Sequence, residues 1–120
     1  MAAERKVIGN HGEDLAAAFL RSRGFRILER QARISRVGEI DIVALDGETL
    51  VFAEVKTRHD VSFGAPEEAV TVAKLRTLAA CAESWRLKRG WSARAYRLDV
   101  VAVDLTGRAP VIRHLENVGG

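Results

Sequence analysis

Cysteine is nearly absent from this chain of 120 residues, in which Cys81 is the single example. One thiol excludes an internal disulfide, and it is too few for a zinc site because the three histidines are also far apart in sequence. A chain without disulfides is typical of a reducing compartment, so we expect a cytoplasmic protein. Cys81 lies in an alanine-rich helical stretch, where a thiol usually acts as a small apolar filler.

Long hydrophobic runs are absent as well. The longest apolar run near the start covers residues 15–20, which is too short for a signal-peptide core or a membrane span, so we expect no membrane association. Aromatic residues make up only 6%, and neither Trp85 nor Trp91 belongs to a platform on which single-stranded bases could stack. The chain has no internal repeat or linker, and its length suits one compact domain over residues 1–120.

Neither sign of charge dominates, since the net charge is only +3, but the arginines are unevenly placed. Six arginines and one glutamate give residues 21–36 a net charge of +5, which leaves −2 for the rest of the chain. Guanidinium groups suit phosphate geometry, and a basic stripe is typical of nucleic-acid-binding proteins. An equally weighted interpretation is a solvated face that protects the edge of a sheet.

Hydrophobic periodicity predicts seven elements in the order α-β-β-β-α-β-β. The helices cover about residues 5–23 and 66–89, and the strands cover about residues 26–34, 39–45, 50–57, 93–105 and 109–115. The long second helix connects the third and fourth strands, which implies a right-handed crossover and one parallel pair, whereas the hairpins imply antiparallel pairs. We therefore predict an α/β fold with a mixed five-stranded sheet flanked by helices.

The second helix is expected to begin near Pro66, with two glutamates next to the positive end of its dipole, and to stop before Gly90. Its apolar stripe consists of Val72, Leu75, Leu78, Ala79, Ala82 and Trp85. Lys74 and Arg76 on this helix are interpreted as surface charges, with contact to DNA as the alternative. In the fourth strand, Arg97 and Asp99 share a face and are expected to pair.

Charged residues interrupt three of the apolar segments. On the first helix, Glu13 lies on the side formed by small apolar residues. In the strand LVFAEVKTR, Glu54 and Lys56 share a face, because side chains alternate along a strand. In the preceding strand, Glu39 and Asp41 share a face by the same rule.

The register of the hairpin decides whether these charges meet. A four-residue loop would put Leu45 opposite Leu50, whereas a two-residue Asp46-Gly47 turn is the rival. The first register pairs Asp41 with Glu54, Glu39 with Lys56, Val43 with Phe52, and, on the apolar face, Ala44 with Val51, Ile42 with Ala53 and Ile40 with Val55. The rival register places Glu39 opposite Glu54 and Asp41 opposite Phe52. We prefer the first because it pairs leucine with leucine and glutamate with lysine; in both, Asp41 and Glu54 stay on one face.

Two adjacent carboxylates in a sheet core repel each other and lose hydration. Lys56 can offset one of them, and a hard cation would balance the rest, since Mg²⁺ takes carboxylate oxygens together with water and phosphate. Glu13 could add a further carboxylate. The acid-x-lysine triplet is weak evidence by itself, because it also occurs at residues 4–6, and a buried ion-pair network without metal is the alternative.

These residues lie in segments that resemble the bacterial YraN-like family, namely GNHGEDLAAAFLRSRGFRILERQAR, GEIDIVALDGETLVFAEVKTR, FGAPEEAVTVAKLRTLAACAESW and YRLDVVAV. That family is placed in the restriction-endonuclease-like nuclease superfamily, and it is similar to archaeal Holliday-junction resolvases. Those enzymes use a helix glutamate, a strand aspartate and a Glu-x-Lys pair, which correspond by position to Glu13, Asp41, and Glu54 with Lys56. A proline often stands where this chain has Ile40. Glu39 has no fixed role in the pattern and is ranked below the four.

The resemblance implies a metal-dependent endonuclease that hydrolyses DNA phosphodiesters, with Mg²⁺ or Mn²⁺ as cofactor and branched or junction DNA as substrate. Asp41, Glu54 and the Val55 carbonyl would bind the metal. Glu13 would complete the metal shell or hold a water, and Lys56 would orient the attacking water or stabilise charge on the phosphate.

In this interpretation the arginines that contact the DNA backbone are Arg26, Arg30, Arg33, Arg36 and Arg58. Resolvase-like relatives also suggest a homodimer. The alternative function is a non-catalytic DNA-binding module that acts through a partner, and a third is a structural domain whose ion pairs lock the sheet.

Overall fold

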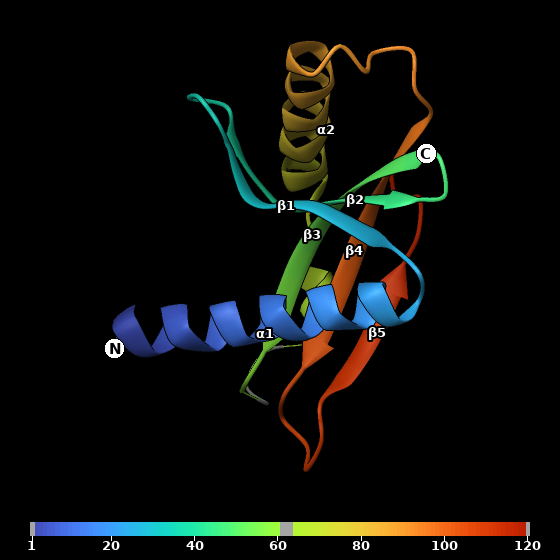
Figure 1. Ribbon diagram of the computed structural model, residues 1–120. Helices are drawn as coiled ribbons and strands as arrows, with labels where there is room; N and C mark the ends of the chain where they lie inside the picture. Colours follow the sequence, from blue (N-terminus) through green and yellow to red (C-terminus); the bar gives the residue numbers. More distant parts are fainter. Residues whose placement is uncertain (1, 61–63, 120) are drawn as a thin grey trace.

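The computed structural model describes residues 2–60 and 64–119, with side chains from residue 10 onward except those of residues 67 and 69. Five strands form one mixed sheet in the order β1-β2-β3-β4-β5 (Figure 1). The elements are α1 (Ala2–Ser22), β1 (Arg26–Ile34), β2 (Gly38–Asp46), β3 (Thr49–Arg58), α2 (Val72–Lys88), β4 (Tyr96–Asp104) and β5 (Val111–Leu115). Strands β3 and β4, which α2 connects, pair in parallel, and the other neighbours pair antiparallel. The predicted fold class and element order are confirmed.

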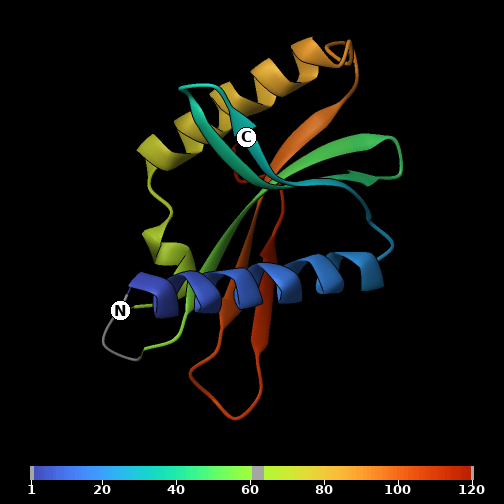
Figure 2. The same ribbon diagram turned by 60° about the vertical axis from the view of Figure 1, so that its left-hand side comes forward.

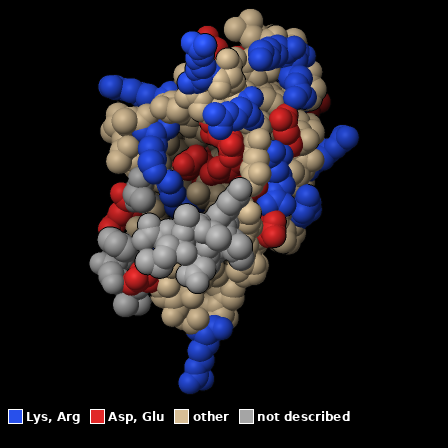
Figure 3. Space-filling view, turned by 90° about the vertical axis from the view of Figure 1, so that its left-hand side faces the viewer, with Lys and Arg blue, Asp and Glu red and all other residues tan. Residues whose placement is uncertain are grey.

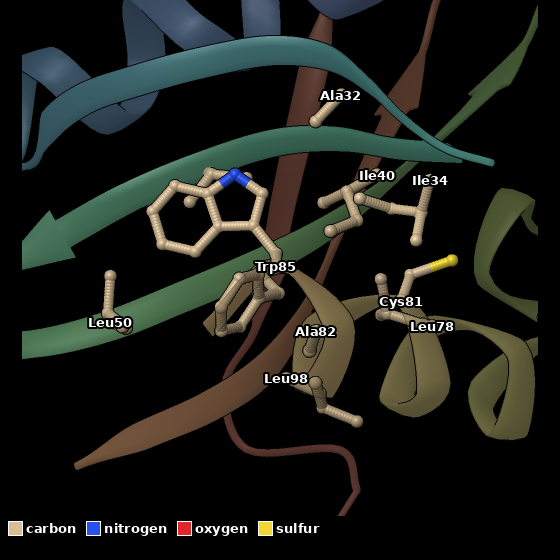
Figure 4. Close-up of a cluster of buried hydrophobic side chains, with 11 residues drawn as sticks. Ala32, Ile34, Ile40, Leu50, Leu78, Cys81, Ala82, Trp85 and Leu98 are labelled. Carbon is tan, nitrogen blue, oxygen red and sulfur yellow. The ribbon is translucent and has the colours of Figure 1, made fainter. Parts of the chain in front are cut away.

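The two helices lie on either side of the sheet, and each packs against it to form its own hydrophobic cluster (Figure 2). On the α1 side, Ala17 and Leu20 pack against β2, β3 and β4. On the α2 side, Trp85 lies over the sheet with its ring centroid 5.6 Å from that of Phe52 (Figure 4). Cys81 belongs to this second cluster and is fully buried, so its expected role as an apolar filler is confirmed. In the described part of the chain, no helix is both long and apolar enough to cross a membrane.

Helix α2 begins later than the sequence indicates. Residues Pro66–Ala69 form a separate 3₁₀ turn, and α2 starts at Val72 after Thr71, whose hydroxyl accepts a hydrogen bond from the Lys74 backbone N–H at 3.2 Å. The threonine hydroxyl satisfies an otherwise unpaired N–H, which is why the helix begins there rather than at the proline. The expected first turn at Pro66 is therefore wrong. Val72 is also 66% exposed and does not belong to the buried stripe.

The end of α2 agrees with the prediction. The helix stops at Lys88, and Gly90 has a φ of +69°. This left-handed conformation costs glycine no steric strain, so the chain can leave the helix and turn toward β4.

A buried network of charged side chains connects β4 with β5 and with the segment that follows β5. Asp99 is fully buried, and its carboxylate lies 2.7 Å from His114 Nε2 and accepts hydrogen bonds from Arg97 Nε at 3.1 Å and from the Asn117 N–H at 3.0 Å. Burial by itself raises the pKa of Asp99, but the hydrogen bonds from His114, Asn117 and Arg97 outweigh it and lower the pKa. The expected pairing of Arg97 with Asp99 is confirmed.

Replacing Asp99 by alanine should lower the free energy of unfolding by about 3–5 kcal/mol at pH 7, because Arg97 and His114 would lose their buried acceptor. Urea denaturation followed by circular dichroism measures this. The matched control is Asp46→Ala, which removes the more exposed carboxylate 3.0 Å from Arg97 Nη1 and should cost less than about 1 kcal/mol. Since the pKa of Asp99 is lowered, its contribution should also disappear as the pH falls below its ordinary value of 3.8. Equal losses for the two variants would contradict the buried role of Asp99.

Candidate functional site

The site lies where β2 and β3 separate, a place that we call the fork. The observed register pairs Leu45 with Leu50, as preferred from the sequence, but the ladder ends at Ile42 opposite Ala53. Just beyond that point, Asp41 Oδ2 accepts a hydrogen bond from the Val55 N–H at 2.8 Å. The side chain thus takes the place of the backbone acceptor that a continuous ladder would supply. Because the N–H and C=O of one residue point toward the same neighbouring strand, the Val55 carbonyl is also directed to the fork.

The geometry of the fork differs from the continuous ladder expected from the sequence. Ile40 packs in the α2-side cluster, whereas Ile42 packs in the α1-side cluster, so the alternation of side chains breaks at Asp41. On β1, Gln31 lies between the residues paired with Ile42 and Ile40, and its φ is +51°. Gln31 therefore has a left-handed backbone conformation directly beside the residues of β2 where the alternation breaks. The expected facing pairs Asp41–Glu54, Ile40–Val55 and Glu39–Lys56 are therefore wrong, since the ladder ends at Ile42 and Ala53.

Glu54 and Lys56 lie on the α2 side of β3, next to the fork. Lys56 Nζ is 3.5 Å from Glu54 Oε1, and the two side chains are 23% and 19% exposed. Glu54 lines a hollow of about 240 Å³ with Glu39 and with Ala73, Lys74, Thr77 and Leu78 of α2, which we call the α2 hollow. Lys56 lines a neighbouring hollow of about 340 Å³ that extends to Pro66 and Glu68. Figure 3 shows acidic side chains in a recess on this face, with basic side chains above it and to either side.

The ionised form of Asp41 is poorly compensated in the folded protein. Burial, and then repulsion by Glu54 and Glu13, raise its pKa to about 7. The hydrogen bond from Val55 and the charge of Lys56 act in the opposite direction without cancelling the effect. A carboxylate held in this state would be stabilised by a cation placed next to it.

Glu13 approaches the same place from α1. It is only 6% exposed, and its carboxylate accepts hydrogen bonds from Arg30 Nε at 2.9 Å and from Gln31 Nε2 at 3.4 Å. The helix can lie directly on β3 because Gly12 has no Cβ, which would overlap the Thr57 side chain. The expected position of Glu13 on the side of α1 that faces the core is confirmed.

The donor set fits Mg²⁺ bound mostly through water. Among the described residues, no three histidine, cysteine, aspartate or glutamate side chains are grouped closely enough to form a complete metal cage. Mg²⁺ does not require one, since it usually keeps several waters and binds through one or two carboxylates plus phosphate. Asp41, Glu54 and the Val55 carbonyl are the groups that would hold it. The contacts of Glu13 with Arg30 and Gln31 favour the alternative in which it holds a water, and its direct coordination stays a prediction.

The predicted DNA-binding arginines are not equivalent. Arg26, Arg33 and Arg36 are exposed along β1 and the turn that follows it. Arg30 is half-buried and bonds to Glu13 and, at 2.7 Å, to Asp14. Arg58 lies on β3, 3.5 Å from Asp104. The first three are therefore the arginines of this set best placed for a phosphate backbone, while Arg30 belongs to the surroundings of the fork.

One residue of the site was missed by the sequence analysis. Lys74, interpreted there as a surface charge, is exposed but lines the α2 hollow with Glu54 and Glu39. Nearby Lys56 lowers the pKa of Lys74, against the opposing effects of Glu54 and Asp41. A signal was available, because Lys74 precedes the buried Leu78 and Cys81 by four and seven residues and so shares their face of the helix.

The fold and the site define an α/β domain in which a forked mixed sheet gathers two carboxylates and two lysines between helices on its two sides. Residues 12–103 match the sequence model of the uncharacterised protein family UPF0102, and the chain belongs to this family. It is 48% identical over 116 residues to a UPF0102 protein of Arthrobacter sp. (strain FB24), an alignment that covers 96% of this chain and 98% of the relative. It is 46% identical over 113 residues to a UPF0102 protein of Geobacter sulfurreducens, covering 93% and 88%. The YraN-like family named from the sequence motifs is thereby confirmed, and the matched residues span the whole site from Glu13 to Lys74.

Proposed function

We propose that this protein is a metal-dependent endonuclease that hydrolyses DNA phosphodiester bonds, with a preference for branched DNA. The observation that carries the proposal is the convergence of Asp41 and Glu54 at the fork, with Lys56 3.5 Å from Glu54. The raised pKa of Asp41, caused by its burial and by Glu54, favours this proposal over a structural ion-pair lock, in which the charges are compensated.

The residues have separate tasks in this reaction. A bound Mg²⁺ or Mn²⁺ would supply a Lewis acid and an acidified water. Asp41, Glu54 and the Val55 carbonyl would hold the ion, Lys56 would orient the attacking water or stabilise charge on the phosphate, and Glu13 would hold a water next to Asp41. The water oxygen bonds to phosphorus while one P–O ester bond breaks. The water loses a proton and the leaving oxygen gains one, which gives a phosphomonoester and a hydroxyl group.

The preference for branched DNA is supported by the kind of groups that the arginines present. Arg26, Arg33 and Arg36 offer exposed guanidinium groups, which suit phosphates, and phosphate contacts carry no base sequence. Selection by the shape of the DNA is then the available basis for specificity. The homodimer stays a prediction, which size-exclusion chromatography tests.

The proposal is tested with purified protein and a panel of linear, flapped and four-way DNA of unrelated sequences. Each substrate is incubated with Mg²⁺, Mn²⁺, Ca²⁺ or EDTA. We expect cleavage with Mg²⁺ or Mn²⁺, none with EDTA, and faster cleavage of the branched substrates. Binding of DNA without cleavage under any of these conditions would instead support a non-catalytic DNA-binding module that acts through a partner.

A further inference from the structure

We propose that Lys74 is a further catalytic residue, which binds the scissile phosphate from α2 opposite Lys56. This inference rests on the proposed nuclease function, and it adds a second cation to a site for which the sequence motif supplies one.

Local structure places Lys74 at the edge of the interface between α2 and the sheet. The Thr71 hydroxyl accepts the hydrogen bond of the Lys74 N–H at 3.2 Å and so defines where the helix starts. One and two turns later, Leu78 and Cys81 are buried against the sheet. Gly38 of β2 lets the helix come close, because a Cβ there would lie 3.0 Å from Thr77 Cγ2 and 3.3 Å from Cys81 Sγ. Lys74 therefore emerges on the sheet-facing side of the first turn.

The surroundings of Lys74 indicate an anionic ligand. Its side chain and those of Glu39 and Glu54 line the same hollow. Glu54 already has Lys56 as an ion-pair partner at 3.5 Å. Among the described side chains, none forms an ion pair with Lys74. The Lys56 side chain lies next to that of Lys74. Two like charges side by side are stabilised by an anion between them.

The charges of the site also favour a second cation. Ionised Asp41, Glu54 and Glu39 outnumber Lys56 and Lys74, so the five side chains together carry one negative charge. A divalent cation then leaves one positive charge. A phosphodiester carries one negative charge, whereas the addition of hydroxide to phosphorus in the transition state brings a second. The positive charge of Lys74 therefore attracts the doubly charged transition state more strongly than the singly charged substrate, which is the condition for catalysis.

The test compares Lys74→Met with Arg76→Met. Both changes remove one exposed cation from α2 and keep an unbranched side chain with good helix propensity, but Arg76 does not line the α2 hollow. With a four-way or flapped DNA and Mg²⁺, we expect Lys74→Met to lower kcat by roughly 100-fold, with little change in affinity for the same DNA in Ca²⁺. Arg76→Met should behave like the wild type, and Lys74→Arg should retain part of the activity.

A second measurement separates this inference from the nuclease function. The thermal stability of each variant is recorded with Mg²⁺ alone and with Mg²⁺ plus inorganic phosphate. We expect phosphate to add a further increase in Tm for the wild type and Arg76→Met but not for Lys74→Met. If the wild type cuts DNA and Lys74→Met cuts equally fast, the role of Lys74 is overturned and the nuclease remains. If the wild type cuts nothing but the phosphate effect depends on Lys74, the anion site remains and the nuclease function falls. A phosphate effect that is absent from the wild type, or kept by Lys74→Met, also overturns the inference.

Discussion

Replacing Glu54 by glutamine is expected to reduce Mg²⁺-dependent cleavage of branched DNA by at least about 100-fold, since loss of even an outer partner of a metal ligand costs 10–100-fold. Glutamine keeps the size and the carbonyl oxygen of the side chain but loses its negative charge. Of the two carboxylates at the fork, only Asp41 would then hold the ion. Cleavage rates at saturating DNA, measured over a series of Mg²⁺ concentrations, give both the loss of rate and the weaker dependence on the ion.

The control for this experiment is Glu48→Gln, which removes an exposed glutamate from the β2–β3 turn at the other end of the same hairpin. It should cut DNA like the wild type. Circular dichroism and DNA binding in Ca²⁺ should be retained by both variants. A Glu54→Gln variant that cuts normally would contradict the proposed metal site. One whose main defect is a lower free energy of unfolding would favour the structural ion-pair interpretation.

Replacing Asp41 by asparagine is expected to stabilise the metal-free protein, although it disables the site. Burial, and then Glu54, raise the pKa of Asp41 from 3.8 to about 7. The folded protein therefore binds more protons than the unfolded chain between these values, and its stability falls as the pH rises through this range. At pH 8 the full free-energy cost of ionising Asp41 in the folded protein is present. Each unit of difference between the two pKa values corresponds to about 1.4 kcal/mol. We expect a gain of roughly 2 kcal/mol, less than the full difference, because the buried amide of asparagine also loses hydration on folding.

This second prediction is measured by urea denaturation in EDTA at pH 8 and at pH 5. The asparagine oxygen can still accept the hydrogen bond from the Val55 N–H, so the fork should keep its shape. The gain should shrink at pH 5, where Asp41 is mostly protonated. Added Mg²⁺ should stabilise the wild type at pH 8 but not the variant. A destabilised Asp41→Asn at pH 8 would contradict the claim that ionised Asp41 is poorly compensated.

Much of the fold could be predicted because its causes are local or periodic. The alternation of apolar residues identifies the strands, and the requirement that Leu45 face Leu50 selects the hairpin register that the structure has. The 3.6-residue period of α1 places Glu13 on its buried side. These are properties of neighbouring residues, so they can be read before the chain is folded.

Other features of the site depend on contacts between distant segments. The start of α2 was misplaced because a proline followed by two glutamates is as good a local signal as the threonine cap at Thr71. Lys74 was undervalued because a lysine near the start of a helix is usually solvated, and only the approach of β3 to α2 brings it to Glu54.

The sequence by itself determined the order of the elements, the register of the central hairpin and the identity of the acidic residues and Lys56. The tertiary structure alone decided that β2 leaves β3 at Ile42, that Asp41 turns to the Val55 N–H, and that Lys74 joins the site from the other side of the hollow. The physical reason is that alternation and periodicity depend on the few residues around each position. Strand separation and helix docking depend instead on the summed packing of two hydrophobic clusters whose members are far apart in the chain.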